Sequence, residues 1–210
     1  MMLSRRALIL ALGLALAGCS GGLLPKPPPP PDFYRLSPAD SASMAVRPVA
    51  VQLLVGEIAA SGALDTARIV LTPNATRVEY YADAEWTDRA PVLVDNLLLD
   101  TLQRSGHFAR VARRSLTLRA DYLVVGTLRH FEADYSAATL PRVRVAVELQ
   151  LLHVSDGTIV AARRFTAAVP ARQNTVPAVV AAFDVAAHQA LHDVPSWIAG
   201  ALPGSASRHP

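Results

Sequence analysis

The sequence predicts an α+β fold: a single domain with a mainly antiparallel sheet and two amphipathic helices packed on it. Two segments place apolar residues three and four positions apart, as helices with one buried face do. Several shorter segments alternate apolar and polar residues, which is typical of strands with one face in the core and one in water. Helices that cover one face of such a sheet form a layered domain.

The strand segments are short and are separated by turn signals. We expect strands at 33–36, 46–58, 69–72, 77–81, 108–113, 122–131, 142–151 and 159–169. The run 142–151 alternates most regularly, and Asp156-Gly157 connects it to the run that follows. Because glycine adopts positive φ at low cost, this dipeptide predicts a hairpin between the two runs.

The first helix occupies the segment before Gly106. Thr87 or Asp88 can cap its N-terminus, Pro91 lies in the first turn, where proline is tolerated, and Gly106 suits the position after the last turn. Its predicted buried face consists of Val94, Leu97, Leu98, Thr101 and Leu102.

The second helix begins near Asn174 or Thr175, and Pro195 is expected to end or kink it. Beyond this proline, Trp197 and Ile198 are expected to fold a last apolar turn onto the domain. The predicted core stripe of the helix is Val176, Val180, Phe183, Ala187, Leu191 and Val194.

The N-terminus has the features of an export signal. Arg5 and Arg6 precede an apolar run that is too short to span a bilayer, and small residues precede Cys19. The stretch 16–19 resembles the bacterial lipobox, in which the cysteine receives a diacylglyceryl group and the peptide is cut before it. We therefore expect a signal peptide at 1–18 and lipidation of Cys19. The alternative is an ordinary signal peptide with a coincidental cysteine.

The next residues suggest a destination and a tether. Enterobacterial lipoproteins with Asp after the lipidated cysteine stay at the inner membrane, so by resemblance Ser20 favours the periplasmic face of the outer membrane. Pro25 and the prolines at 27–31 fix φ near the polyproline II value, which makes 19–32 a lipidated, semi-rigid tether. The domain is expected to extend over 33–202, followed by a disordered tail at 203–210.

The composition of the mature chain argues against nucleic acid as a partner. Removal of Arg5 and Arg6 with the signal peptide lowers the formal charge from +3 to about +1. No basic tract with interleaved aromatic residues is present in the sequence. Cys19 is the single cysteine, so the fold is expected to depend on burial of apolar residues rather than on disulfides.

No catalytic template is present in the sequence, so we expect neither enzymatic activity nor a cofactor. The sequence lacks a G-x-S-x-G elbow, a Walker loop and a G-x-G-x-x-G motif. His188 and His192 have the spacing of metal ligands on a helix. Solvated surface histidines explain this pair better, and no metal site is expected.

Charged residues at strand ends and in the predicted hairpin leave two interpretations open. Asp83 with Glu85, and Glu132 with Asp134, have the spacing of acid–base pairs on a strand, but solvated charge is the favoured interpretation. Four arginines could bind lipid headgroups or a partner's carboxylates, although a plain exposed sheet face is favoured: Arg142, Arg144, Arg163 and Arg164.

The order of several motifs resembles a known family. After the lipobox and tether come Tyr34-Arg35-Leu36, Tyr80-Tyr81, Trp86, the Pro91 helix with its leucines, and Ser105-Gly106-His107-Phe108. Together they look like the ABC-type transport auxiliary lipoproteins, the PqiC-like lipoproteins of intermembrane lipid transport. The similarity runs over 33–202 and is most specific over 80–111.

The resemblance implies a non-enzymatic part of a lipid transport machine. In such systems an ABC permease and ATPase at the inner membrane work with MCE-domain proteins that cross the periplasm. The auxiliary lipoprotein is similar to a docking element at the outer-membrane end, and a homo-oligomer is expected by analogy. The alternative is a free-standing periplasmic lipid carrier with an acyl-sized cavity between helix and sheet. A cell-envelope hydrolase is disfavoured, because no nucleophile has a catalytic partner in the sequence.

Tyr80, Tyr81 and Trp86 are the candidate partner interface. Aromatic side chains supply amphipathic contact area at low entropic cost. The alternative is that they attach the helix to the sheet as core residues, and the position of Trp86 near the helix start favours this alternative for Trp86.

Overall fold

The computed structural model describes residues 29–39, 48–115 and 119–202. The signal peptide, Cys19, the tether as far as residue 28 and the tail at 203–210 lie outside the described residues, so the expectations for them stay predictions. The described helices and strands all belong to one compact unit, Pro31–Pro210. Within the described ranges, no helix is both long and apolar enough to cross a membrane.

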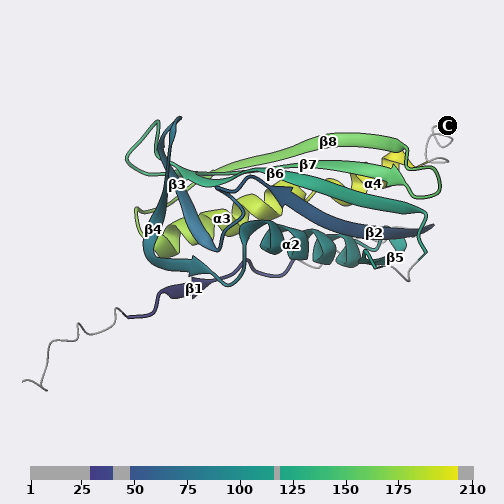
Figure 1. Ribbon diagram of the computed structural model, residues 1–210, viewed down its shortest axis with the longest axis horizontal. Coiled ribbons are helices and arrows are strands. Elements are labelled where there is room, and N and C mark those ends of the chain that lie inside the picture. The colour runs from purple at the N-terminus through teal and green to yellow at the C-terminus, as the bar shows by residue number, and fades with distance from the viewer. Residues whose placement is uncertain (1–28, 40–47, 116–118, 203–210) are drawn as a thin grey trace, which may run out of the picture. The chain divides into compact units, whose positions relative to one another are not determined.

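Most of the strands lie close to where the alternation of the sequence places them. They are β1 (Asp32–Tyr34), β2 (Val49–Ala60), β3 (Arg68–Asn74), β4 (Arg77–Trp86), β5 (Phe108–Arg113), β6 (Tyr122–Asp134), β7 (Arg142–His153) and β8 (Ile159–Pro170). The helices are α2 (Ala90–Arg104), α3 (Val176–Leu191) and α4 (Val194–Ala201). Figure 1 shows α2 and α3 side by side along the sheet; α2 contacts β2 and β5, and α3 contacts β7 and β8.

The sheet is organised around β6, which pairs with three other strands. Residues 122–128 of β6 pair with β2, and Ala133 and Asp134 pair with β3 along the same edge. The opposite edge of β6 pairs with β7 along its length. The sheet therefore forks: β2 leads to β5, β3 leads to β4 and β1, and β7 leads to β8.

The prediction of a mainly antiparallel sheet is wrong. The β1–β4, β2–β5, β2–β6 and β3–β6 pairs are parallel, and only β3–β4, β6–β7 and β7–β8 are antiparallel. Alternation reports that one face of a strand is buried, and helices that cover one side of a mixed sheet produce the same pattern in parallel strands. The α+β class and the single compact unit fit the structure. The β7–β8 hairpin is confirmed, with Gly157 at φ +69°.

Helix α2 is the predicted first helix with a different N-cap. Arg89 occupies the N-cap in an extended conformation, and the side chain of Asp88 accepts the Arg89 N–H at 2.8 Å, so neither Thr87 nor Asp88 is the cap. Pro91 lies in the first turn, and Gly106 follows the helix with φ +67°, as expected. Of the predicted face, four residues are buried and Thr101 is half-buried: Val94, Leu97, Leu98 and Leu102.

Helix α3 buries a face that is rotated from the predicted stripe. Val176 and Val180 are only half-buried, whereas the buried residues are Val179, Ala182, Phe183, Ala186, Ala187, Ala190 and Leu191. Four alanines on this face lack bulk beyond Cβ and let the helix lie close to the sheet. Thr175 is the N-cap, and Pro195 lies in the first turn of the separate helix α4. The expected apolar turn is confirmed, because Ile198 is buried and Trp197 packs edge-on against Phe165. The centroids of these two rings are 5.3 Å apart.

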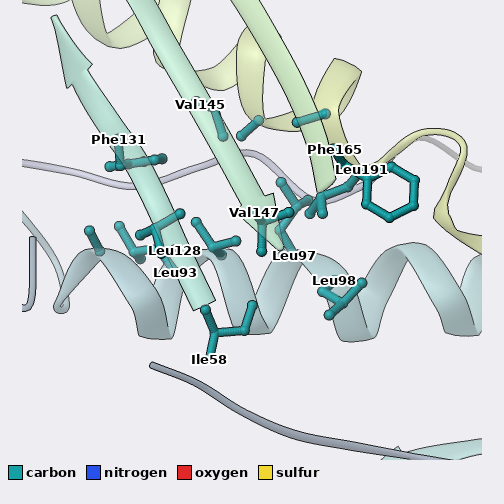
Figure 2. Close-up of a cluster of buried hydrophobic side chains, with 14 of the residues drawn as sticks. Ile58, Leu93, Leu97, Leu98, Leu128, Phe131, Val145, Val147, Phe165 and Leu191 are labelled. Carbon is teal, nitrogen blue, oxygen red and sulfur yellow. The ribbon is translucent and has the colours of Figure 1, made fainter. Parts of the chain in front are cut away.

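The core fills the layer between the helices and the sheet. Figure 2 shows Leu93, Leu97 and Leu98 of α2 in one cluster with side chains of the strands above them. The inward residues of β7 are fully buried, as the alternation predicts: Val143, Val145, Val147, Leu149 and Leu151. Burial of each such side chain contributes about 1.5–3 kcal/mol, so this layer supplies much of the stability of the domain.

The substitution Gly126→Ala tests how tightly this layer is packed. A Cβ at position 126 would lie 2.6 Å from Leu149 Cδ2 and 3.0 Å from the Glu148 carbonyl oxygen, and Leu149 is fully buried. We expect a loss of about 1–3 kcal/mol in the free energy of unfolding, measured by chemical denaturation. Gly62→Ala is the control, because a Cβ there meets no atom within 4 Å. An unchanged midpoint for Gly126→Ala would contradict the described packing.

Candidate partner interface

The three aromatic residues of the predicted interface lie on one strand but do not share one surface. Tyr80, Tyr81 and Trp86 all belong to β4. Consecutive positions of a strand point to opposite faces, so the two tyrosines face different sides. Both are half-buried, whereas Trp86 is 1% exposed.

Trp86 lies in the core, which is the alternative that the sequence left open. Its ring centroid is 5.6 Å from that of Phe131 on β6 and 5.2 Å from that of Phe183 on α3. The two phenylalanine rings are 4.8 Å apart, so the three rings form a mutual cluster. Trp86 therefore holds β4, β6 and α3 together and offers no surface to a partner.

Tyr80 is covered on one side by an arginine. The Arg68 guanidinium carbon lies 3.7 Å from the centroid of the Tyr80 ring, which is a cation–π contact between β3 and β4. Arg68 is exposed, so this planar pair reaches the surface of the β3–β4 ribbon. Stacked arginine and tyrosine side chains are enriched where proteins bind other proteins.

Tyr81 belongs to a chain of hydrogen bonds that connects three segments. The Tyr81 and Tyr135 hydroxyls are 2.8 Å apart, and the Tyr135 hydroxyl donates to Asn174 Oδ1 at 2.6 Å. Because Tyr135 uses its proton on Asn174, Tyr81 donates to Tyr135. Burial, followed by this hydrogen bond and the neighbouring Tyr135, raises the pKa of Tyr81 far above its usual value, so Tyr81 stays neutral. Neither Tyr135 nor Asn174 carried a sequence signal for this role.

These contacts build one end of the sheet, which we call the hairpin end and define as residues 72–81 and 134–141. Figure 1 shows the β3–β4 turn and the β6–β7 loop projecting at the same end of the molecule. The Tyr135 N–H donates to the Thr72 carbonyl oxygen at 3.0 Å and fixes the two together. Two large apolar side chains are exposed here, Val78 at 47% and Leu140 at 45%. An apolar, aromatic surface on a rigid ribbon is suited to binding a protein.

The chain enters the domain through a segment that is fastened to the helices. We call residues 35–39 the strap. The Ser37 N–H and hydroxyl donate to the two carboxylate oxygens of Asp184 at 2.7 and 2.8 Å, and the Ala39 N–H donates to Asp100 Oδ2 at 2.7 Å. The strap therefore connects the segment after β1 to both α3 and α2. No local sequence pattern predicts these pairs, because they join residues more than 60 positions apart.

The histidine pair of α3 does not act as a unit. His188 Nε2 lies 3.2 Å from the Pro38 carbonyl oxygen and thus adds to the strap, whereas His192 is exposed beside Asp193. Within the described ranges, no group of three or more histidine, cysteine, aspartate or glutamate residues could hold a metal ion.

Two carboxylates of the domain are buried. Asp95 of α2 is 6% exposed and pairs with Arg113 of β5, which ties the helix to the sheet. Burial raises the pKa of Asp95; the Arg113 pairing opposes this shift and the charge of Glu57 adds to it. Glu132 is also 6% exposed, so the interpretation as solvated charge is wrong for this member of its pair. Asp83 is exposed, as expected.

The four arginines of the β7–β8 hairpin do not form one cluster. Arg164 bonds to Glu148, and Arg144 lies 3.4 Å from Asp134. Arg163 lies over the ring of Phe165 at 5.0 Å, and Arg142 is at the start of β7. Arg142, Arg163 and Arg164 are exposed, as the favoured interpretation of an exposed sheet face expects, and the binding of lipid headgroups or a partner's carboxylates stays a prediction.

Comparison with known proteins identifies relatives of the whole domain. The family model described as ABC-type transport auxiliary lipoprotein component matches residues 34–194. The crystal structure of protein XCC0632 from Xanthomonas campestris, described as a DUF330 protein, is similar at 30% identity. It covers 81% of this chain and 95% of its own, with a TM-score of 0.75. No curated protein matches the sequence.

More distant structures are similar in fold only. An uncharacterised protein is 17% identical over 81% of this chain and 99% of its own, with a TM-score of 0.63. A PelC dodecamer from Paraburkholderia phytofirmans is 17% identical over 70% of this chain and 92% of its own. Its TM-score of 0.43 is too low for an argument about this chain.

The strap can be tested by removing its acceptor on α3. Asp184→Ala removes both acceptors of Ser37, and we expect a loss of about 1–2 kcal/mol in the free energy of unfolding. Hydrogen exchange at the Ser37 and Ala39 amides should accelerate more than exchange in β6. Asp193→Ala is the matched control, since this exposed carboxylate bonds only its neighbour His192 among the described contacts. Unchanged exchange at Ser37 would show that the strap is not held by Asp184.

Proposed function

Because the chain belongs to the family of ABC-type transport auxiliary lipoprotein components, we propose that it is a membrane-anchored, non-enzymatic component of an MCE/ABC intermembrane lipid transport system. In this proposal it docks or stabilises the transport assembly at the periplasmic face of the outer membrane. The observation that carries the proposal is the family match over 34–194, which runs from the end of β1 to the start of α4.

The proposed anchor is the acylated Cys19. Two or more acyl chains hold a protein stably at a bilayer, and a proline-rich tether can place the domain on the order of 30 Å from it. The chain then enters the domain at β1, which pairs with β4 at the edge of the sheet, and continues into the strap. A load on the tether would thus reach the sheet and both long helices. The residue Ser20 supports the outer membrane as the destination.

The proposed partner surface is the hairpin end. Tyr80 and the exposed Val78 share one side of β4, and Leu140 is exposed in the β6–β7 loop. Tyr81 joins β4 to Tyr135 from the other side of the strand, and Trp86 supports the hairpin end from the core. The partners in this proposal are MCE-domain proteins, working with ABC permease and ATPase components. Several copies of the lipoprotein would form a homo-oligomer around the partner, which raises the effective concentration of each contact.

The alternative, a free-standing lipid carrier, requires an acyl-sized cavity between the helices and the sheet. That layer is instead occupied by fully buried side chains, among them Leu98, Leu128, Phe131, Val147 and Phe183. This packing favours a binding and docking role over a carrier with an internal lipid site.

The anchor is tested by the substitution Cys19→Ala in the full chain, expressed in its own host. We expect the protein to move from the membrane fraction to the soluble periplasmic fraction, because no acyl group is left to hold it. Separation of inner and outer membranes on a density gradient then locates the wild-type protein. A Cys19→Ala variant that stays in the membrane fraction would contradict the proposed anchor.

The partner surface is tested by photocrosslinking in cells. A benzoylphenylalanine residue replaces Val78 or Leu140 at the hairpin end, or Val185 of α3, which is equally exposed at 45%. We expect crosslinks to an MCE-domain protein from Val78 and Leu140 but not from Val185. Crosslinks from Val185 alone would place the partner on the helical side and overturn the proposed surface.

A further inference from the structure

A groove of about 280 Å³ is lined by residues of the loop before β3, of the β3–β4 ribbon and of β6 and β7. Its lining includes the apolar residues Leu64, Val70 and Val78. It also includes five titratable residues of β6 and β7: Arg129, His130, Glu132, Asp134 and Arg144. Val78 and Asp134 also belong to the hairpin end, whereas Arg129, His130, Glu132 and Arg144 lie outside it.

A bulge in β6 directs the polar residues into this groove. The pairing of β6 with β7 shifts register between Leu128 and His130, which inserts Arg129 as an extra residue. After the shift, Phe131 faces the core against Phe183, so His130 and Glu132 face the opposite side of the sheet. Without the bulge, the next residues of β6 would exchange faces, and Phe131 would leave the core.

The buried carboxylate of Glu132 holds both the bulge and the imidazole. One oxygen accepts the Phe131 N–H at 2.8 Å, and the other accepts from His130 Nδ1 at 2.7 Å. Because Nδ1 bonds to the Glu132 carboxylate, the orientation of the ring is fixed. Among the described residues, Nε2 of His130 has no hydrogen-bond partner, and the His130 side chain is 40% exposed in the groove.

Two arginines complete the polar side. Arg144 lies directly opposite Glu132 in the register of β6 and β7, so it is the diagonal neighbour of His130 on the same face of the sheet. Its guanidinium makes one long contact, 3.4 Å to Asp134, and leaves most of its five N–H donors available. Arg129 bonds to Glu148 through Nε and Nη2, so its Nη1 also remains available for a ligand. Both carboxylates of the groove are already engaged, Glu132 by His130 and Asp134 by Ser136 and Arg144.

We propose that this groove binds a phosphate group, with Arg144 as its principal donor and Arg129 as an auxiliary cation. His130 supplies a further donor as the imidazolium, in which Nδ1–H bonds Glu132 and Nε2–H is available to a phosphate oxygen. A guanidinium fork beside a fixed imidazole matches the oxygens of a phosphate monoester or diester. The phosphate has two possible sources, a phospholipid headgroup or free phosphate. The exposed apolar side chain of Val78 in the lining distinguishes them, because only a lipid has a glycerol and acyl portion that can contact it. The inference does not rest on the proposed function, since binding requires no transport partner.

The test is an NMR titration of the full mature chain with Cys19→Ser, which keeps the protein in aqueous solution. Inorganic phosphate and dihexanoyl phosphatidylglycerol below its micelle concentration are the probes, with sodium chloride at equal ionic strength as the reference. Arg144→Gln removes the fork, and His130→Gln removes the imidazole. Arg142→Gln is the matched control, because it lies two residues away on the same face of β7 but outside the groove.

We expect saturable shifts at residues of the groove, weakened about tenfold by Arg144→Gln and His130→Gln and unchanged within about twofold by Arg142→Gln. Tighter binding of the lipid, with shifts at Leu64 and Val70, would identify a headgroup site; equal binding of both probes would identify a free-phosphate site. The absence of saturation with either probe, or equal weakening by Arg144→Gln and Arg142→Gln, would overturn the proposal. Thermal melting of each variant verifies that it is folded.

Discussion

The structure depends on one strand that must satisfy three neighbours. β6 is 13 residues long, and its pairing with β2 ends at Leu128 before its pairing with β3 begins at Ala133. The strand bulges in the gap between these two pairings. Because a bulge bends a strand and increases its twist, the β3–β4 ribbon can leave the plane of the other strands. Both the hairpin end and the phosphate groove exist because β6 changes partner at this point.

The two faces of β6 have different roles: one packs in the core and the other lines the groove. On the helical side, Phe131 joins Trp86 and Phe183 in a ring cluster that fastens the ribbon and α3 to the central strands. On the other side, the same few residues supply His130 and Glu132 to a polar groove. A core residue and a polar site residue alternate along the strand, so a change in the register of β6 would damage both at once.

Local sequence features were predicted well because the physics that produces them is local. The bounds of β5, the Asp156-Gly157 hairpin and the helix end at Gly106 depend on a few adjacent residues. The parallel pairs were missed because alternation reports burial and not the direction of a neighbour. The buried face of α3 differs from the predicted stripe because the prediction favoured valines. The alanines on the observed face allow the helix to lie closer to the sheet.

The candidate site was less accessible to sequence reasoning. Tyr80 and Tyr81 were singled out, but Tyr135, Asn174 and the partners of the strap come from distant segments that only the fold brings together. Glu132 was singled out only as a possible acid–base pair with Asp134, because a charged residue between the apolar Phe131 and Ala133 is what a half-exposed strand is expected to carry. Its burial depends on the bulge and on His130, and no spacing rule reports either of them.

If the protein works inside a transport assembly as we propose, it binds the other components of that assembly in the cell. The measurement is affinity purification of the full-length, lipidated protein from its own host in mild detergent, with mass spectrometry of the proteins that accompany it. We expect recovery of MCE-domain proteins together with an ABC permease or ATPase. Recovery of the lipoprotein alone, carrying phospholipid, would contradict this proposal and favour a free-standing carrier.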